Sequence, residues 1–555
     1  MKSISYAECL LRVLRGMGVE RIFASPGSDW APLWEALAKS YLPGEVPDYI
    51  SVRHEETAVA MASGYAKATG KLPAVVLHTT VGTLHAAMTL RNALHERVPM
   101  VVLAGEVIAF GEPPAPSVGR QWLRLLTDTG GPARLIEACV KWGFGLNASV
   151  ILPQTIQRAC QLASAAPRGP VFVSVPAEFL METMPGALPA PSALPRASAA
   201  DPSALDELAR ALCDAKKPMI ITEEAGRNPA TVGRLVELAE ALGAPVLEAW
   251  QPYYFNFPRD HPLYGGVVTD RMVEIAGDAD ALLLVEAVLP WHPPSALPRA
   301  GQKVFVLGED PLRSRLPFWG IKADLIVPGE LDAALGGLVE RVRKIAPAKA
   351  RPQAVARQSI PAANDVLDTC RVARELNALL SADSVVVNET ITHRLDLLRL
   401  LTKLGPGGWY ESSFGGLGVG LATALGVKHA QPSRTVIVTI GDGALHYNPV
   451  PGSFGASQEH GLPILVVLFN NAGYLSQKGD VATYYPEGVA VQTRKFAGTS
   501  ISPRPQYTKL AEAYGGYGER VERAADLRPA LVRALEQVGK GRLALIDVVL
   551  APVNP

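Results

Sequence analysis

The sequence is poor in cysteine and in long apolar runs, and it carries no net charge. Its five cysteines are scattered and form no C-x-x-C pair, so they support neither a zinc ribbon nor a disulfide framework and favour a reducing compartment. Lysine plus arginine (53) balances aspartate plus glutamate (53), whereas a nucleic-acid-binding protein is normally basic. The apolar stretch Ala281–Val285 is far shorter than the ~18–20 residues of a membrane span. We therefore expect a cytoplasmic protein that binds neither nucleic acid nor a membrane.

What the chain does contain is apolar sequence divided by proline-rich stretches. Hydrophobic residues make up 48% of its 555 residues, which excludes a mainly disordered protein. At ~100–200 residues per domain, the length suggests about three domains. Two Pro/Ala-rich stretches without helical or alternating periodicity, Pro185–Pro202 and Ala346–Ala363, are typical of linkers. We predict domains at residues 1–185, 200–345 and 364–555.

All three segments alternate short β-branched runs with longer helical patterns. Examples are Ala74–Leu77 in the first segment, Ala281–Val285 in the second and Thr435–Ile440 in the third. Strands that alternate with helices indicate parallel sheets covered on both faces. The prediction is three consecutive open parallel-sheet α/β domains. Because such sheets bind ligands at the carboxyl ends of their strands, the loops there are the candidate sites.

Two motifs in the third segment follow predicted strands. Gly441-Asp442-Gly443 ends the strand Thr435–Ile440, and Asn470-Asn471-Ala472-Gly473-Tyr474 ends the strand Ile464–Phe469. Residues 444–469, between the two motifs, are enough for one helical crossover. Such a crossover would place both loops at the same sheet edge. Glycines let the backbone approach a phosphate, and Asp and Asn oxygens suit Mg²⁺. Either motif alone is also a common turn.

Together the two motifs resemble the thiamine diphosphate signature, GDG followed about 25 residues later by NN. This resemblance implies that Mg²⁺ is held by the Asp442 side chain, the Asn471 side chain and the Gly473 carbonyl. It also implies that the residues around both loops contact the cofactor: Gly441, Gly443, Ala444, Tyr447, Asn471 and Tyr474.

A pair of acidic residues stands at the start of a predicted helix in the first segment, in His54-Glu55-Glu56. They could simply stabilise the helix N-terminus through the macrodipole. A carboxylate at an apolar domain edge can instead take a raised pKa and hold a proton on a heterocycle nitrogen. The segment resembles the thiamine diphosphate family's HE…A…MA.GYA stretch. The resemblance implies that Glu55 bonds the aminopyrimidine ring and so promotes formation of the thiazolium ylide, with Glu56 as the alternative.

Further matches extend the resemblance over nearly the whole chain. Gly415-Gly416-Leu417-Gly418 matches the stretch that places a large apolar side chain, here Leu417, between the two rings of the cofactor, with Gly416 beside it. Glu389 and Thr390 match further cofactor contacts. The chain is identified as a member of the thiamine diphosphate-dependent decarboxylase/acetolactate synthase superfamily. Membership implies pyrimidine-binding, central and diphosphate-binding domains in that order. It also implies a homodimer or homotetramer with active sites at the subunit interface.

Local matches favour the benzoylformate decarboxylase branch. The turn Ser25–Asp29 matches one whose serine, here Ser28, contacts the substrate carboxylate. The loop Leu77–Gly82 matches one with a catalytic histidine, here His78, and His292 matches a second, more weakly. Ser28 could instead be a helix N-cap, His78 a packed core residue and His292 a surface loop residue. Three other histidines have the spacing of helix-face residues and receive no role: His85, His95 and His460.

The resemblance implies non-oxidative decarboxylation of a 2-oxo acid through a ylide and an enamine. One alternative is an acetolactate synthase-type carboligase, in which the enamine meets a second carbonyl rather than a proton. Another is an oxidase that binds FAD in the central domain, although FAD is not expected. The sequence leaves open whether the substrate side chain is aliphatic or aromatic.

Overall fold

The computed structural model describes residues 3–40, 44–108, 112–114, 116, 128–269, 271–316, 320–345, 365–411 and 415–551. Three six-stranded sheets, parallel throughout, form three consecutive α/β units, which confirms the predicted fold class. Residues 185–201 join the first unit to the second without a regular element. The second predicted linker, Ala346–Ala363, lies outside the described residues.

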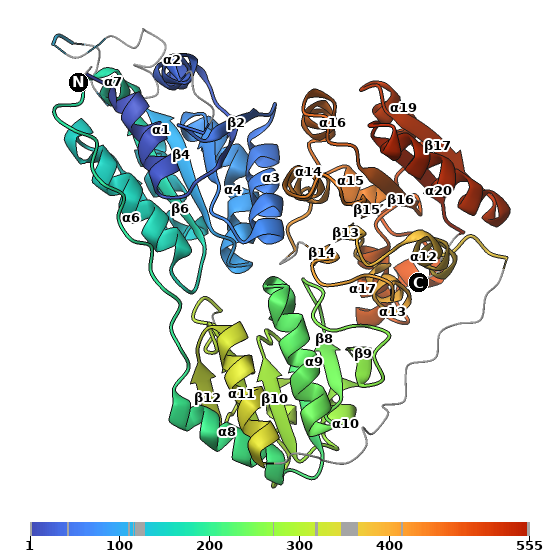
Figure 1. Cartoon of the computed structure of the whole chain (residues 1–555). Coiled ribbons are helices and arrows are strands. Elements are labelled where there is room, and N and C mark those ends of the chain that lie inside the picture. The colour runs from blue at the N-terminus through green and yellow to red at the C-terminus, as the bar shows by residue number, and fades with distance from the viewer. Residues whose placement is uncertain are drawn as a thin grey trace.

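The first sheet has the strand order β2-β1-β3-β4-β6-β5. Helix α1 begins after a capping box in which the Ser5 hydroxyl accepts from the Glu8 N–H while the Glu8 carboxylate accepts from the Ser5 N–H. Helices α1 and α6 cover the outer face of the sheet, and α3 and α4 cover the inner face (Figure 1). The strands are β1 (Arg21–Ser25), β2 (Asp48–Ser51), β3 (Ala74–Leu77), β4 (Met100–Glu106), β5 (Trp142–Gly145) and β6 (Pro170–Pro176). The α-helices are α1 (Tyr6–Gly16), α2 (Ala31–Lys39), α3 (Glu55–Thr69), α4 (Thr79–His95), α5 (Pro132–Leu135), α6 (Leu152–Ser164) and α7 (Ala177–Met181), and the 3-10 helix η1 (Ser28–Trp30) precedes α2.

The second sheet has the strand order β12-β11-β10-β7-β8-β9. Its central strand β10 is buried along its whole length, as expected for a parallel strand covered on both faces. The strands are β7 (Pro218–Thr222), β8 (Val246–Ala249), β9 (Tyr264–Val268), β10 (Ala281–Val285), β11 (Lys303–Gly308) and β12 (Leu325–Pro328). The helices are α8 (Pro202–Asp214), α9 (Ala230–Leu242), α10 (Met272–Ala276) and α11 (Leu331–Ile345).

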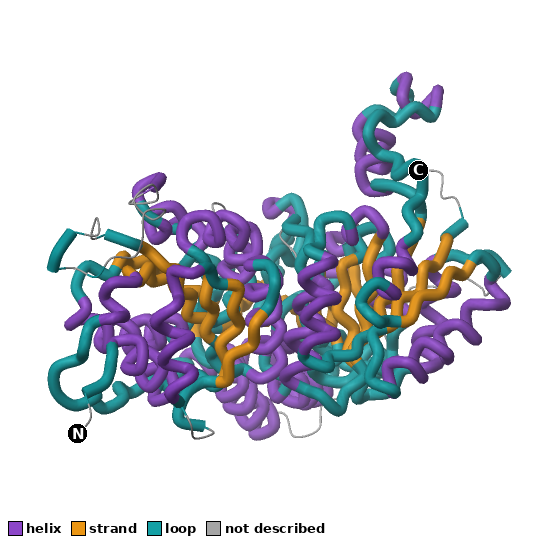
Figure 2. Tube along the Cα trace, turned by 90° about the horizontal axis from the view of Figure 1, so that it is seen from above, coloured by secondary structure: helices purple, strands orange, loops and turns teal. Residues whose placement is uncertain are grey.

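The third sheet has the strand order β14-β13-β15-β16-β18-β17. Helices α17 and α18 contain no buried residue and project from the body of this unit (Figure 2). The strands are β13 (Val385–Glu389), β14 (Trp409–Glu411), β15 (Val436–Gly441), β16 (Leu465–Asn470), β17 (Tyr517–Val521) and β18 (Ala544–Val549). The helices are α12 (Thr369–Leu379), α13 (Arg394–Leu400), α14 (Gly420–Ala430), α15 (Asp442–Leu445), α16 (Val450–Glu459), α17 (Leu475–Tyr484), α18 (Val489–Thr493), α19 (Tyr507–Glu512) and α20 (Ala524–Gly539).

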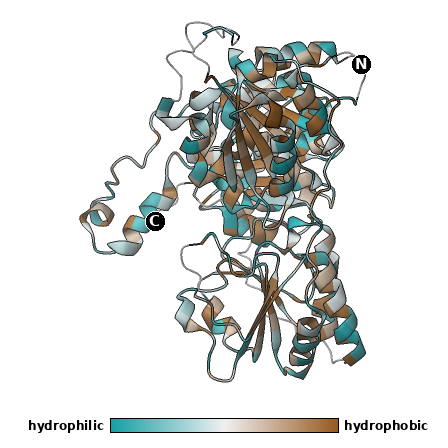
Figure 3. Ribbon diagram, turned by 90° about the vertical axis from the view of Figure 1, so that its left-hand side faces the viewer, coloured by the Kyte–Doolittle hydropathy of each residue, from teal (hydrophilic) through white to brown (hydrophobic). Residues whose placement is uncertain are grey.

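The first and third units share one hydrophobic core through helices α3 and α14. Glycines allow this close crossing: a Cβ on Gly64 would lie 2.0 Å from the Thr423 carbonyl oxygen, and one on Gly426 would lie 2.0 Å from that of Met61. The strands are the most apolar part of each layer, whereas the helices carry both hydrophilic and hydrophobic residues (Figure 3). Within the described residues, no helix has the length and apolar character that crossing a membrane would require.

Candidate active site

The two glycine-bearing loops of the third unit meet at one edge of its sheet. Strands β15 and β16 are parallel neighbours, and Asp442 follows the first as the opening residue of α15. One Asp442 carboxylate oxygen accepts from the Gly443 N–H at 2.9 Å, and the other accepts from the Gly473 N–H at 3.1 Å. Burial raises the pKa of this carboxyl group, although the backbone N–H donors partly oppose the rise. The loops predicted to act together therefore lie in direct contact.

Asn471 is oriented by a buried histidine that sequence reasoning missed. The Asn471 Nδ2 lies 3.3 Å from His393 Nε2, and His393 Nδ1 lies 2.6 Å from the Thr369 hydroxyl. Burial lowers the pKa of His393 to about 4, so the ring is neutral near pH 7 and its Nε2 can accept. The side-chain oxygen of Asn471, which accepts from the Gly473 N–H at 3.1 Å, thus lies on the side toward the Asp442 loop.

Glu389 anchors the glycine loop that carries Leu417. Its buried carboxylate accepts from the backbone N–H groups of Gly418 (2.7 Å), Val419 (3.0 Å) and Gly420 (3.1 Å) at the start of α14, and from the Asn448 side chain (2.8 Å). Thr390 is buried beside it and donates to the Asn388 side chain at 2.7 Å. The Glu389 side chain therefore holds the glycine loop in place, and its contact with the cofactor stays a prediction.

Leu417 is packed, half-buried, against the core shared by the first and third units. Its neighbour Gly416 accepts through its carbonyl from the Asn92 side chain at 3.1 Å, and Gly418 has a φ of +103°, which favours glycine. Tyr447 is exposed on the adjoining loop. Beside Asp442, the Tyr474 ring would lie 2.8 Å from a Cβ on Gly443, so this glycine provides the space for the ring.

Glu55 and His78 gather around Gly82 on the first unit. A Cβ on Gly82 would lie 3.0 Å from the Glu55 carboxylate and 3.1 Å from His78 Cβ. His85, which received no role from the sequence, contacts Glu55 with its Nδ1 3.2 Å from Oε2. Only the i, i+7 spacing of His78 and His85 along one helix could have suggested that both face the same glutamate.

Glu56 points elsewhere although it follows Glu55 in the chain. Its carboxylate accepts from the Thr89 hydroxyl at 3.2 Å and would lie 3.4 Å from a Cβ on Gly418 of the third unit. Burial raises its pKa to about 7, and the Thr89 hydrogen bond opposes that rise. Geometry therefore assigns the two glutamates to different surroundings, and only Glu55 lies with His78.

Ser28 and Asp29 form the start of η1 beside this group. Ser28 is exposed and is not a helix N-cap, because Gly27 holds that position and no side chain caps the turn; the N-cap alternative is wrong. Asp29 is buried, and its Oδ1 lies 2.7 Å from His78 Nδ1. His78 is thus a half-buried, hydrogen-bonded residue rather than a packed core residue.

His292 belongs to the second unit, whereas Glu55 and His78 belong to the first. It is exposed and lines a cavity of about 500 Å³ between the second and third units. Trp250 and Leu289 form apolar parts of its wall, and Gly415 brings the wall within two residues of Leu417. The structure places His292 near the glycine loop of its own chain.

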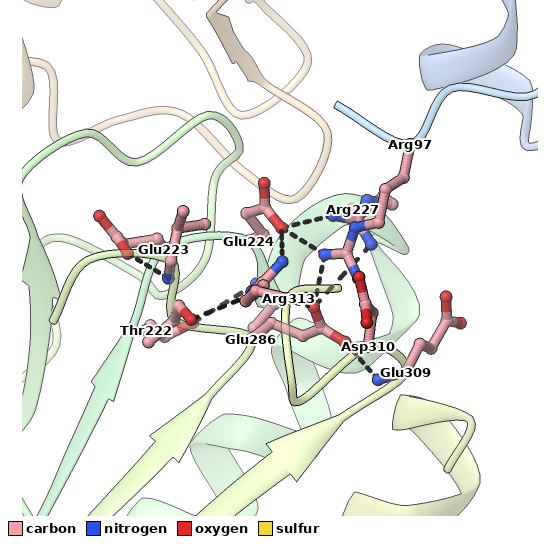
Figure 4. A network of polar contacts seen from close by, with 12 residues as sticks. Arg97, Thr222, Glu223, Glu224, Arg227, Glu286, Glu309, Asp310 and Arg313 are labelled. Atoms are coloured by element: carbon pink, nitrogen blue, oxygen red, sulfur yellow. Dashed lines mark hydrogen bonds and ion pairs between the residues drawn. The ribbon is translucent and has the colours of Figure 1, made fainter. Parts of the chain in front are cut away.

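A buried ion-pair network lies at the carboxyl edge of the second sheet (Figure 4). Glu224 and Glu286, which follow β7 and β10, bind three guanidinium groups between them: those of Arg97 from the first unit, Arg227 and Arg313. Burial alone would raise the pKa of Glu286, but Arg97 and Arg313 hold it below its usual range. This is the edge at which an α/β sheet would bind a nucleotide.

Comparison with known proteins places these features in a family. Three family models match: "Thiamine pyrophosphate enzyme, N-terminal TPP binding domain" at residues 4–123, the corresponding "central domain" at 205–312 and the corresponding "C-terminal TPP binding domain" at 392–548. Benzoylformate decarboxylase of Pseudomonas aeruginosa is 27% identical, with all of both chains covered. Acetolactate synthase isozyme 3 large subunit of Escherichia coli is also 27% identical, over 99% of this chain and 95% of its own.

Solved structures agree on the fold. A putative thiamin diphosphate-dependent enzyme from Mycobacterium smegmatis has a TM-score of 0.81 at 25% identity, covering 99% of this chain and all of its own. A 4-hydroxybenzoylformate decarboxylase from Rhodococcus jostii has a TM-score of 0.83 at 24% identity with the same coverage. With all three family models matched in order along the sequence, the chain belongs to the thiamine diphosphate-dependent enzyme family.

Proposed function

We propose that the protein is a thiamine diphosphate- and Mg²⁺-dependent carboxy-lyase that decarboxylates a 2-oxo acid without net oxidation, in the manner of benzoylformate decarboxylase. The observation that carries the proposal is the meeting of Glu55 and His78 around Gly82. Decarboxylation needs one proton transfer at the cofactor and one at the substrate. A carboxylate and an imidazole in one place provide a group for each transfer.

The diphosphate loops have the donor set that Mg²⁺ requires. The Asp442 carboxylate, the Asn471 amide oxygen and the Gly473 carbonyl are hard oxygen ligands, and Mg²⁺ completes its shell with phosphate and water. A cation beside Asp442 would also relieve the desolvation that raises the pKa of this buried carboxyl group. These residues would hold the metal and, through it, the diphosphate.

Thiamine diphosphate, when bound, supplies the carbanion that attacks the 2-oxo group and the electron sink that accepts the electron pair left by carbon dioxide. The residues of the chain do the rest. Glu55 would hold a proton on the aminopyrimidine ring, Leu417 would pack against the cofactor, and Ser28 would donate to the substrate carboxylate. His78 returns a proton to the substrate carbon that has lost carbon dioxide.

A second copy of the chain is part of this proposal, as a homodimer or homotetramer. Helix α4 exposes Val81, Leu84 and His85 beside Glu55, and exposed apolar side chains next to a reactive group suit an interface. The diphosphate loops of one copy would then face the Glu55–His78 group of the other. Because all five cysteines are free, a reducing compartment such as the cytoplasm suits the protein.

The carboligase alternative rests on the Escherichia coli relative, which matches this chain at the same identity as the decarboxylase. The two reactions diverge after carbon dioxide leaves, and a positioned histidine that returns a proton favours the decarboxylase. The flavin oxidase has weaker support. At the central sheet edge, where a flavin nucleotide would bind, Glu224 and Glu286 are already paired with arginines of the chain.

The test is product analysis with a panel of aliphatic and aromatic 2-oxo acids, with thiamine diphosphate and Mg²⁺ supplied. We expect carbon dioxide and the corresponding aldehyde in equal amounts. An acetohydroxy acid from pyruvate in place of the aldehyde would establish the carboligase. Failure of every 2-oxo acid to release carbon dioxide would refute both reactions.

A further inference from the structure

Asp29 is a buried acidic residue to which the sequence assigned no role. The turn that contains it places its side chain inside the first unit, and only 3% of the residue is exposed. The neighbouring Trp30 fixes this turn, because its ring N–H donates to the Leu77 carbonyl at 2.8 Å, at the residue before His78. The turn after β1 and the turn after β3 are therefore tied together where Asp29 meets His78.

The protein makes space for this contact with two glycines. A Cβ on Gly105 in β4 would lie 1.6 Å from the Asp29 carboxylate, and a Cβ on Gly27 would lie 2.1 Å from His78 Nδ1. Any other residue at either position would displace one member of the pair. The carboxylate thus lies in a pocket built from the backbone of β4 and η1.

The Asp29 carboxylate has a donor for each of its oxygens. Oδ1 lies 2.7 Å from His78 Nδ1, and Oδ2 accepts from the Thr79 N–H at 3.4 Å. Because a buried carboxylate accepts and does not donate, His78 Nδ1 must carry the proton of this bond. Neutral His78 is then the Nδ1–H tautomer, and its Nε2 is the atom that gains or loses a proton.

Two opposing fields act on the His78 ring. His78 is the N-cap of α4, and the positive end of a helix dipole disfavours an imidazolium there. Asp29 on η1 and Glu55 on α3 act in the opposite direction, whereas His85, on the same helix as His78, contacts Glu55. The hydrogen bond to Asp29 is the main cause that raises the pKa of His78; burial lowers it, and the charges of Asp29 and Glu55 raise it.

We propose that Asp29 is the positioning residue of the acid–base pair: it holds His78 as the Nδ1–H tautomer and stabilises its imidazolium, so that Nε2 transfers the proton. In that transfer the Nε2–H bond breaks and its electron pair stays on nitrogen. The electron pair on the substrate carbon that has lost carbon dioxide forms the new C–H bond, and water reprotonates Nε2. The catalytic part rests on the proposed function, whereas the Asp29–His78 pair does not.

The pair can be tested without any substrate. Hydrogen–deuterium exchange at the imidazole C2 carbon, measured by mass spectrometry of His78 peptides across a pH series, reports the pKa of this one histidine. The proteins are the wild-type chain, Asp29→Asn, which keeps the shape and removes the charge, and Asp48→Asn, which removes an exposed carboxylate elsewhere in the same unit. We expect the pKa of His78 to fall in Asp29→Asn only. The pKa of His54, which burial lowers, should be the same in all three proteins.

Unchanged titration of His78 in Asp29→Asn would overturn the proposal. If Asp29→Asn does not fold, the wild-type protein still decides: a His78 pKa below the ordinary ~6.5 would show that the helix N-terminus outweighs Asp29 and would equally overturn it.

The kinetic consequence is tested with the best substrate of the panel. Protonated His78 is the acid, so turnover falls as pH rises through its pKa. In Asp29→Asn this fall should move to lower pH, and kcat should be about 10- to 10²-fold lower near neutral pH with KM nearly unchanged. A raised KM with an unmoved pH profile would make Asp29 a structural residue and overturn its positioning role. If the titration shifts but no 2-oxo acid is decarboxylated, the pair stands and the proposed function fails.

Discussion

The two halves of the candidate site are built on opposite principles. On the third unit, the Asp442 and Gly473 loops lie at the ends of adjacent parallel strands, and backbone N–H groups and glycines make most of the contacts. On the first unit, the Asp29 side chain contacts His78, and Glu55, from a third element, lies with His78 around Gly82. Backbone geometry suits holding a diphosphate and a metal, whereas paired side chains suit moving protons. Each variant below changes one of these two groups of residues and leaves the other intact.

The largest effect is expected for Glu55→Gln. The amide cannot exchange the proton that activates the cofactor, so turnover should fall about 10³-fold, within the range for general acid–base catalysis. Thiamine diphosphate affinity should stay nearly normal because the other half of the site is intact. The measurement is hydrogen–deuterium exchange at the thiazolium carbon of the bound cofactor. Exchange at the wild-type rate would show that Glu55 is not the activating group, and Glu56→Gln would then be tested.

Asp442→Ala should lower the affinity for the cofactor, which Glu55→Gln should leave nearly normal. Removal of a direct ligand weakens Mg²⁺ and thiamine diphosphate together, because the metal joins the diphosphate to the protein; we expect an affinity loss of at least ~10²-fold. Calorimetric titration of the cofactor at fixed Mg²⁺ measures it. Asp480→Ala, on the exposed helix α17, is the matched control. Normal affinity in Asp442→Ala would mean that this loop is only a turn.

His78→Ala should lower turnover by roughly 10²-fold or more and leave cofactor affinity unchanged. The residue lies with Glu55 on the first unit, whereas the Asp442 and Gly473 loops belong to the third, so the loss should appear in kcat. Steady-state kinetics with the best 2-oxo acid decide it. Near-normal turnover would make His78 a packing residue and leave His292 as the remaining candidate.

The smallest effect is expected for His393→Ala. This variant tests how much one side chain contributes to the group of residues on the third unit, where backbone contacts predominate. Without its ring, the Asn471 amide loses the acceptor that orients its oxygen toward the Asp442 loop. Mg²⁺ affinity should fall about 10-fold, the lower end for loss of a residue that orients a metal ligand. His261→Ala, in the second unit, is the control. Equal Mg²⁺ affinity in both variants would contradict the orienting role.

The half built on backbone was largely predictable from the sequence. Gly441-Asp442-Gly443 and the Asn471 loop each follow a β-branched run, and residues 444–469 between them suit one crossover. Parallel strands joined in this way place their loops at the same edge, so the contact between Asp442 and Gly473 follows from local pattern and topology. The strand ends differed from the predicted ones by a single residue, because hydrogen-bonded register rather than composition sets the end of a strand.

The side-chain contacts of the first unit could not be predicted from the sequence, because they depend on tertiary structure. Glu55 and Glu56 are adjacent, and successive residues of a helix point in directions about 100° apart. Their side chains therefore contact different neighbours, and those neighbours are set by tertiary packing. Asp29 and His78 are 49 residues apart and belong to turns after different strands. Periodicity predicts which face of an element is buried, but it does not state which polar groups on two separate elements will meet. The sequence by itself therefore determined the three parallel sheets, the family and the meeting of the Asp442 and Gly473 loops. Only the tertiary structure decided the partners of His78, the separation of Glu55 from Glu56 and the ion-pair network at the edge of the central sheet. Each of these depends on contacts between segments far apart in the chain.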